Sequence, residues 1–182
     1  PEVESFARMA PLGGRSSDGK LVRREEDGKL VFHSREPNLY FADADLLSIF
    51  SIRMVSGNAP TALKEPHTMV LTQKLAEKFF GKADPINKTL KISMQSGSRE
   101  FTVSGVTEDP KPNSSITFDA LLSMETLEQR AKEMGGTALE NQWLHAVFTT
   151  FLKFRPDSDI KLAEQKINDA ACEPLRFHSE RP

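Results

Sequence analysis

The histidines and the single cysteine are the side chains best able to bind a metal or to act as a base and a nucleophile near neutral pH. The four histidines are His33, His67, His145 and His178, and no two of them lie two or four residues apart. Zinc ligands on one strand or helix use those spacings, and no His-Glu-x-x-His sequence occurs. Cys172 is the only cysteine, which excludes an intrachain disulfide and a cysteine-based metal cluster. We therefore expect no metal, no cofactor and no catalytic residue here, and a passive, half-buried Cys172.

Pairs of acidic residues could bind a cation or act together as an acid and a base. The candidate pairs are Asp43 with Asp45, Asp157 with Asp159, and Glu108 with Asp109. The two aspartate pairs offer the first two ligands of an EF-hand loop, but they lack its glycine and its distal glutamate. Because both precede predicted helices, we interpret them as helix caps. The third pair precedes Pro110, where an exposed turn is expected, although carboxylate chemistry stays open at this stage.

Motifs for nucleotides and for serine catalysis are absent from the sequence. No Gly-x-Gly-x-x-Gly, no Gly-x-Ser-x-Gly and no P-loop occurs, so the chain does not itself bind ATP through a P-loop. Two Ser-x-x-Lys sequences, Ser17–Lys20 and Ser158–Lys161, lack the partner motifs of penicillin-binding enzymes, and we interpret them as chance. A net charge of -2 over 182 residues argues against a nucleic-acid partner and against an anionic membrane surface.

The periodicity of apolar residues predicts the elements that would position these side chains. Strands are expected at residues 3–9, 38–41, 52–55, 67–71, 89–94, 101–106 and 143–154. Helices are expected at residues 46–50, 73–80 and 124–134, and from Asp157 or Ser158 to Pro174. Two Asp-Gly pairs, Asp18-Gly19 and Asp27-Gly28, are typical of tight hairpin turns around a charged strand. Strands in hairpins mixed with helices favour an α+β fold.

Five residues are expected to mark the ends of the helices. Asp43, Thr72 and Ser123 precede three of the helices and are suited to cap their free N–H groups. Gly81 follows the helix over 73–80, where a left-handed residue would end it. Pro174 is expected to stop the last helix.

The turn and helix signals through the middle of the chain occur in a distinctive order. In sequence they are Tyr40–Phe50, Ser56-Gly57-Asn58, Ala62–Pro66, Val70-Leu71-Thr72, Ala76–Gly81, Asp84-Pro85-Ile86, Lys88-Thr89-Leu90, Phe101–Val106, and Pro112-Asn113-Ser114 through Phe118-Asp119. This order resembles the MacB-like periplasmic core domain, the extracytoplasmic part of MacB/FtsX-type ABC transporter permeases. The opening Pro1–Glu4 is similar to the segment that follows the first transmembrane helix in that family.

The resemblance covers most of Pro1–Pro11, Asn38–Ser123 and Trp143–Leu175, and leaves out residues 12–37 and 135–142. Asn87 stands where the family usually has glycine, and Ser115 where histidine is frequent. Asparagine tolerates left-handed backbone geometry, so we expect the turn at Asn87 to survive.

The resemblance implies an α+β fold of two lobes. A porter-like split βαβ lobe would be built from residues 1–56 and 143–182, and a mixed α/β "sabre" lobe would be inserted at residues 57–142. The strand–helix–strand unit over 38–55 and the strand–helix unit over 143–173 would pair as the two halves of the first lobe.

The resemblance also implies a place and partners for the chain. It would be the periplasmic segment of a bacterial inner-membrane protein that dimerises with a second permease copy and works with a separate cytoplasmic ATPase. ATP-driven motion of the membrane helices would be relayed through it to a substrate, an adaptor or a lipoprotein, with no enzymatic activity of its own. Permeases of that family carry this domain between two transmembrane helices, so the resemblance implies that membrane helices flank this chain, which begins at Pro1 without a methionine and contains no run of about 18 apolar residues.

Two alternatives from other functional classes stay open at this stage. One is a secreted or periplasmic hydrolase with an unrecognised active site that uses a carboxylate or a serine. The other is an ectodomain that senses a peptide on the same scaffold. No residue of the sequence distinguishes among macrolide, peptide and lipoprotein traffic or the activation of cell-wall hydrolases, which are the roles associated with the family.

Overall fold

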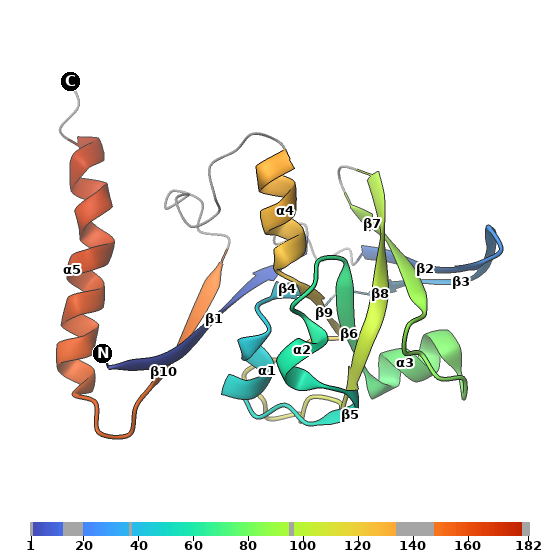
Figure 1. The fold of residues 1–182 in the computed structure, drawn as a ribbon, viewed down its shortest axis with the longest axis horizontal. Helices are drawn as coiled ribbons and strands as arrows, with labels where there is room; N and C mark the ends of the chain where they lie inside the picture. The colour runs from blue at the N-terminus through green and yellow to red at the C-terminus, as the bar shows by residue number, and fades with distance from the viewer. Residues whose placement is uncertain (1, 13–19, 37, 95–96, 134–147, 180–182) are drawn as a thin grey trace.

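One large sheet forms the body of the molecule (Figure 1). The computed structural model describes residues 2–12, 20–36, 38–94, 97–133 and 148–179, with side chains described up to residue 169. Within these residues, the strands are β1 (Val3–Pro11), β2 (Lys20–Glu26), β3 (Lys29–Glu36), β4 (Leu39–Ala42), β5 (Met54–Gly57), β6 (Thr68–Thr72), β7 (Thr89–Met94), β8 (Gly97–Thr107), β9 (Ala120–Ser123) and β10 (Thr149–Phe154). The helices are α1 (Asp45–Ile49), α2 (Ala59–Ala62), α3 (Gln73–Phe80), α4 (Glu125–Glu133) and α5 (Ile160–Ser179).

The sheet is mixed, with mostly antiparallel neighbours. Its order is β10-β1-β4-β9-β6-β8-β7-β2-β3, and β5 pairs with β8 beside this row. The pairs β4–β9 and β6–β8 are parallel, and the other pairs are antiparallel. The predicted α+β class is therefore confirmed. The division into lobes at 1–56 with 143–182 and at 57–142 stays a prediction, and the sheet runs through both parts.

The central strands are buried on both faces, because successive side chains of a strand point to opposite sides. In β6, Met69 and Leu71 belong to one buried apolar cluster and Val70 belongs to the other. The first cluster includes the apolar face of α3, and the second includes Leu46 and Leu47 of α1. The sheet thus separates two cores, with α3 on one face and α1 on the other.

The β2–β3 hairpin and α3 follow the predictions from local sequence. Asp27 and Gly28 have φ angles of 50° and 72°, as a tight hairpin turn requires. Thr72 caps α3 by accepting a hydrogen bond from the Leu75 N–H at 3.3 Å, and Gly81 ends the helix with a φ of 61°. Asn87 adopts the left-handed conformation expected of it, with a φ of 61°.

One pair of glycines allows β5 to lie against β8. A Cβ added to Gly57 would come within 2.5 Å of the Ser104 carbonyl oxygen and 2.8 Å of the Gly105 Cα. Real Cβ atoms do not approach other atoms so closely, and Gly57 also has a φ of 86°. Glycine is therefore required at residue 57 for this pairing.

Three predicted helix ends are wrong. Asp43 makes no cap hydrogen bond to α1, because its carboxylate binds Arg8 instead. Ser123 is the last residue of β9, and its hydroxyl donates to the Leu63 carbonyl oxygen at 2.8 Å rather than capping α4. Asp159, not Asp157 or Ser158, caps α5, because its Oδ1 accepts from the N–H groups of Lys161 and Leu162 at 3.0 and 3.2 Å.

Three further differences concern the extent of the elements. The helix α5 continues through Pro174 to Ser179, so the proline does not stop it. The strand β9 is not predicted from the sequence at all, although all four of its residues are buried. The expected strand over 143–154 is present as β10 from Thr149, and residues 143–147 lie outside the described residues.

Candidate functional site

Arg8, Asp43 and Glu128 form a charged cluster, which we call the Arg8 cluster, that joins β1, the loop before α1, and α4. The Arg8 guanidinium donates to both Asp43 oxygens, each at 2.9 Å, and its Nη2 also donates to Glu128 Oε1 at 2.7 Å. The Arg8 backbone N–H donates to Asp43 Oδ2 at 2.7 Å. The hydrogen bond with Asp43, reinforced by Glu128, raises the pKa of Arg8. All three side chains are 17–20% exposed, so the cluster holds the elements together rather than presenting a free charge.

A second set of contacts joins the start of β1 to the start of α5, and we call it the end joint. The Glu2 carboxylate accepts a hydrogen bond from Lys166 Nζ at 2.6 Å. The Glu2 carbonyl oxygen accepts from the Arg155 N–H and from the Ser158 hydroxyl, both at 3.0 Å. The hydrogen bond from Lys166 is the largest of the effects that lower the pKa of Glu2 to about 2. Together with the antiparallel β1–β10 pair, these contacts join residues that are 140 to 164 positions apart in the sequence into one unit.

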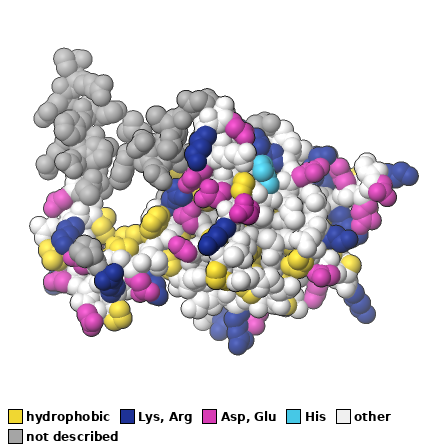
Figure 2. Space-filling view, viewed as in Figure 1, with side chains coloured by type: hydrophobic (Ala, Val, Ile, Leu, Met, Phe, Trp, Pro, Cys, Tyr) yellow, Lys and Arg dark blue, Asp and Glu magenta, His cyan; other side chains and the backbone are white. Residues whose placement is uncertain are grey.

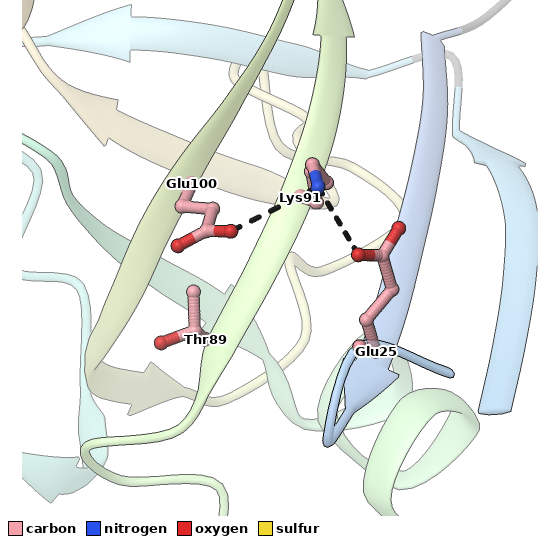
Figure 3. A pocket seen from close by; sticks show the side chains of 5 residues that line it. Glu25, Thr89, Lys91 and Glu100 are labelled. Carbon is pink, nitrogen blue, oxygen red and sulfur yellow. Dashed lines mark hydrogen bonds and ion pairs between the residues drawn. The ribbon is translucent and has the colours of Figure 1, made fainter. Parts of the chain in front are cut away.

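A small polar groove lies on the face of β2, β7 and β8 (Figure 3). Its volume is about 190 Å³, and its lining is Glu25, Gly28, Thr89, Lys91 and Glu100. Lys91 Nζ lies 3.1 Å from Glu25 Oε2 and 3.9 Å from Glu100 Oε1. The single ammonium group pairs with both carboxylates, so the charged side chains that line the groove leave one excess negative charge.

Within the described residues, the histidines considered as candidates for metal binding or catalysis do not form a common site. His33 is exposed on β3, and the His67 ring packs against Phe101 with 5.8 Å between the ring centroids. His145 lies outside the described residues, and the side chains of Cys172 and His178 are not described. No group of three histidine, cysteine or acidic side chains suited to a metal ion occurs among the described residues.

The acidic pairs have structural contacts. Glu108 forms an exposed ion pair with Arg53 at 3.2 Å, and Asp109 Oδ1 accepts from the Lys74 N–H in the first turn of α3 at 2.9 Å.

The residues of the Arg8 cluster and of the end joint are not predicted from the sequence. Their partners lie 35 to 164 residues apart, and no local spacing indicates such pairs.

Exposed apolar side chains gather at the end of the sheet that carries the end joint. Six large examples lie on β1, β10 and α5, and they are Val3, Phe6, Leu152, Ile160, Leu162 and Ile167. Phe6 and Leu152 are register partners, so they share one face of the sheet. Figure 2 shows hydrophobic side chains in this region among charges of both signs, which are also spread over the rest of the same view. Large contiguous patches of exposed apolar side chains are typical of interaction surfaces. Within the described residues, no helix has the length and apolar character needed to cross a membrane.

Comparison with known proteins shows the family to which this chain belongs. A family model described as the MacB-like periplasmic core domain matches residues 2–170. The chain belongs to this family, which is the periplasmic core domain of MacB-like ABC transporter permeases and is not a class of enzyme. No curated protein gave a significant match.

Several solved structures share the fold, and three of them are compared with this chain below. A domain assigned as a permease protein from Porphyromonas gingivalis is 24% identical with a TM-score of 0.67, and the match covers 99% of this chain and 72% of that one. The periplasmic region of MacB from Actinobacillus actinomycetemcomitans is 18% identical with a TM-score of 0.62, covering 94% and 67%. The extracellular domain of the noncanonic ABC-type transporter YknZ from Gram-positive bacteria is 13% identical with a TM-score of 0.53, covering 90% and 70%.

Proposed function

We propose that this chain is the periplasmic domain of an ABC transporter permease, and that it relays ATP-driven motion of membrane helices to a substrate or a partner protein outside the inner membrane. Membership of the MacB-like family supports the transporter context. In this proposal, the chain itself catalyses no reaction. Its role is to transmit motion, which requires a domain that moves as a rigid unit when the membrane helices joined to it move.

The end joint is the observation that carries the proposal. The contacts of Glu2 with Lys166, Arg155 and Ser158 hold the start of β1 against the start of α5. In the proposed arrangement, membrane helices precede β1 and follow α5. A displacement of either helix would then reach the sheet through one joint, because β1 and β10 form its end. The Arg8 cluster would carry the same displacement from β1 to α1 and α4.

We also propose partners and a cellular location for this chain. A second permease copy forms a dimer with this one, a separate cytoplasmic ATPase acts through the membrane helices, and a periplasmic adaptor or lipoprotein is the candidate target. The segment is placed on the periplasmic side of a bacterial inner membrane. The exposed apolar side chains on β1, β10 and α5 support an interaction at that end of the domain.

Distance measurements in the complete transporter test the relay. The full-length permease and its ATPase would be reconstituted in lipid nanodiscs, with Cys172→Ser and one spin label at Lys64→Cys, an exposed position after α2. We expect the distance between the labels of the two copies to differ between the ATP-bound and ADP-bound states. Lys166→Met should reduce this difference, and Lys161→Met, which changes an exposed lysine on the same helix, should not. Identical distances in the two nucleotide states of an active ATPase would refute the relay.

A further inference from the structure

A cleft of about 480 Å³ lies between two loops. One wall is the loop between α1 and β5, which contributes Phe50 to Arg53, and the other is the loop between β8 and β9, which contributes residues from Glu108 to Phe118. Its volume falls in the range of about 300–1,000 Å³ typical of ligand sites in proteins. We call it the edge cleft. It shares no residue with the Arg8 cluster or with the end joint.

The edge cleft combines an apolar interior with a polar rim. Ile116 and Phe118, which are 7% and 4% exposed, line it and belong to the core that contains α1, and Ile52 packs against the same core. Phe50 completes the apolar lining and is held by an edge-to-face contact with Phe151, with 4.9 Å between the ring centroids. An apolar side chain of a ligand could therefore be buried there without displacing protein atoms.

The charges of the rim balance one another. Arg53 and Glu108 form an ion pair at 3.2 Å, and Asp109 and Lys111 add one charge of each sign. Lys111 and Asn113 are exposed, and neither side chain has a partner among the described residues. A rim with donors, acceptors and no net charge suits a polar but neutral ligand rather than an anion or a cation.

Backbone and side-chain hydrogen bonds fix both walls of the cleft. The Ile52 N–H donates to the Leu47 carbonyl oxygen at 2.8 Å, and the Glu108 N–H donates to the Arg53 carbonyl oxygen at 3.0 Å. In the other loop, the Ser114 hydroxyl donates to the Ile116 carbonyl oxygen at 2.8 Å. A preformed cleft requires little ordering when a ligand binds, which favours affinity.

The strand that leaves the cleft has an open edge. Arg53 leads directly into β5, and within the described residues β5 pairs with β8 alone, along one side. Val55, in the middle of β5, is 53% exposed. The outer edge of a strand presents N–H and C=O groups that an extended peptide can pair with, while alternate side chains of the peptide enter neighbouring pockets.

From these observations we propose that the edge cleft binds an extended polypeptide segment, with one apolar side chain in the cleft and its backbone along β5. The apolar interior, the neutral polar rim and the open strand edge each match one part of such a segment. This site is independent of the relay, so its failure would leave the proposed function standing.

Nuclear magnetic resonance titration of the 182-residue chain tests this site. The probe is an N-acetylated, C-amidated peptide of sequence Thr-Thr-Leu-Thr-Thr, and its matched control has serine in place of leucine. We expect saturable shifts of the amides of residues 50–57 and 108–118, with binding of the serine peptide at least tenfold weaker. Absence of saturable shifts up to about 5 mM peptide, or equal binding of the two peptides, would overturn the proposal.

Two variants locate the site. Asn113→Trp should fill the cleft and weaken binding of the leucine peptide at least tenfold, whereas Asn168→Trp, an exposed position on α5 that does not line the cleft, should bind as the unchanged protein does. A nitroxide attached to the peptide should broaden the same amides of the unchanged protein, so the result does not depend on how a variant folds. Broadening elsewhere, or full binding by Asn113→Trp, would show that the edge cleft is not the site.

Discussion

At the scale of single residues, the most consequential side chains are those whose partners lie far away in the sequence. Asp43 has the type and position of a helix cap, and local reasoning assigns it that role. The arginine on the neighbouring strand offers it two strong hydrogen bonds instead. A bidentate arginine–carboxylate contact is stronger than a cap hydrogen bond to a short helix, which explains why the local prediction fails.

Replacement of Arg8 tests the strength of this cluster. Arg8→Met should lower the free energy of unfolding by about 2 kcal/mol, because hydrogen bonds to charged groups contribute about 1.5–3 kcal/mol and Asp43 would lose its partner. Arg53→Met is the matched control, since its side chain is 79% exposed, and its effect should stay below about 0.5 kcal/mol. Urea unfolding measures both, and equal effects would mean that the cluster adds nothing beyond a surface ion pair.

The left-handed turn at Asn87 provides a second test at this scale. Asn87→Ala should lower the free energy of unfolding by about 1 kcal/mol, because a Cβ-bearing residue without a polar side chain is strained at a φ of 61°. Asn87→Gly should be neutral or raise it by up to about 0.5 kcal/mol. Asn113→Ala, at an exposed position without positive φ, should have little effect. A loss of stability in Asn87→Gly would contradict the backbone explanation.

At the scale of elements, sequence periodicity is sufficient to predict a helix or strand that has one polar face. It is insufficient to predict an element that has no polar face. The helix α3 begins and ends where its cap, its apolar spacing and Gly81 indicate. The strand β9 has four buried residues in succession, so it shows no alternation, and its final serine resembles a cap for α4. Only the neighbouring strands β4 and β6 reveal that Leu121 and Leu122 face opposite cores.

Packing of α3 can be tested at Phe79, which is 2% exposed and makes an edge-to-face contact with Phe32. Phe79→Ala should lower the free energy of unfolding by about 3–5 kcal/mol, as is usual for a buried aromatic side chain. Phe6→Ala removes the same atoms at a side chain that is 54% exposed, and it should cost less than about 1 kcal/mol. A loss below about 1 kcal/mol for Phe79→Ala would mean that the wrong face of α3 is buried.

The end joint between β1 and α5 predicts a pH dependence. The pKa of Glu2 is lowered to about 2 from 4.5, chiefly by the hydrogen bond from Lys166. Because the folded value is the lower one, the contribution of the joint is complete above about pH 4.5 and is lost as the pH falls towards 2. In Lys166→Met, side-chain carbon shifts should show that the pKa of Glu2 returns towards 4.5, while Lys161→Met should leave it near 2. An unchanged pKa in Lys166→Met would exclude the joint as its cause.

At the scale of the whole molecule, the sheet is most protected at its centre and least protected at its ends. The strands β6 and β9 are buried on both faces, whereas β3 and β10 are the outermost strands and carry mostly exposed side chains. The family resemblance identifies the domain from the order of its turns. It does not supply this strand order, because pairing between distant segments has no local signal.

Hydrogen exchange measures this gradient directly. Amides of β6 and β9 should exchange only with global unfolding, and those of β3 and β10 should exchange orders of magnitude faster through local opening. The measurement uses the 182-residue chain at neutral pH, where the end joint is intact. If β10 were as protected as β9, the apolar surface on β1, β10 and α5 would have to be covered in solution.

The end joint holds Glu2 and Ser158 together, so the polypeptide between these two residues forms a closed loop. Residues added to or removed from a hairpin or connecting segment within that closed loop leave the spacing between Glu2 and Ser158 unchanged. The domain can therefore acquire a longer arm or a differently shaped binding surface without altering the machinery to which it is fixed. A host protein that carries this domain in one of its own loops would need to accommodate only the joint and the length of α5, which continues from the joint to Ser179.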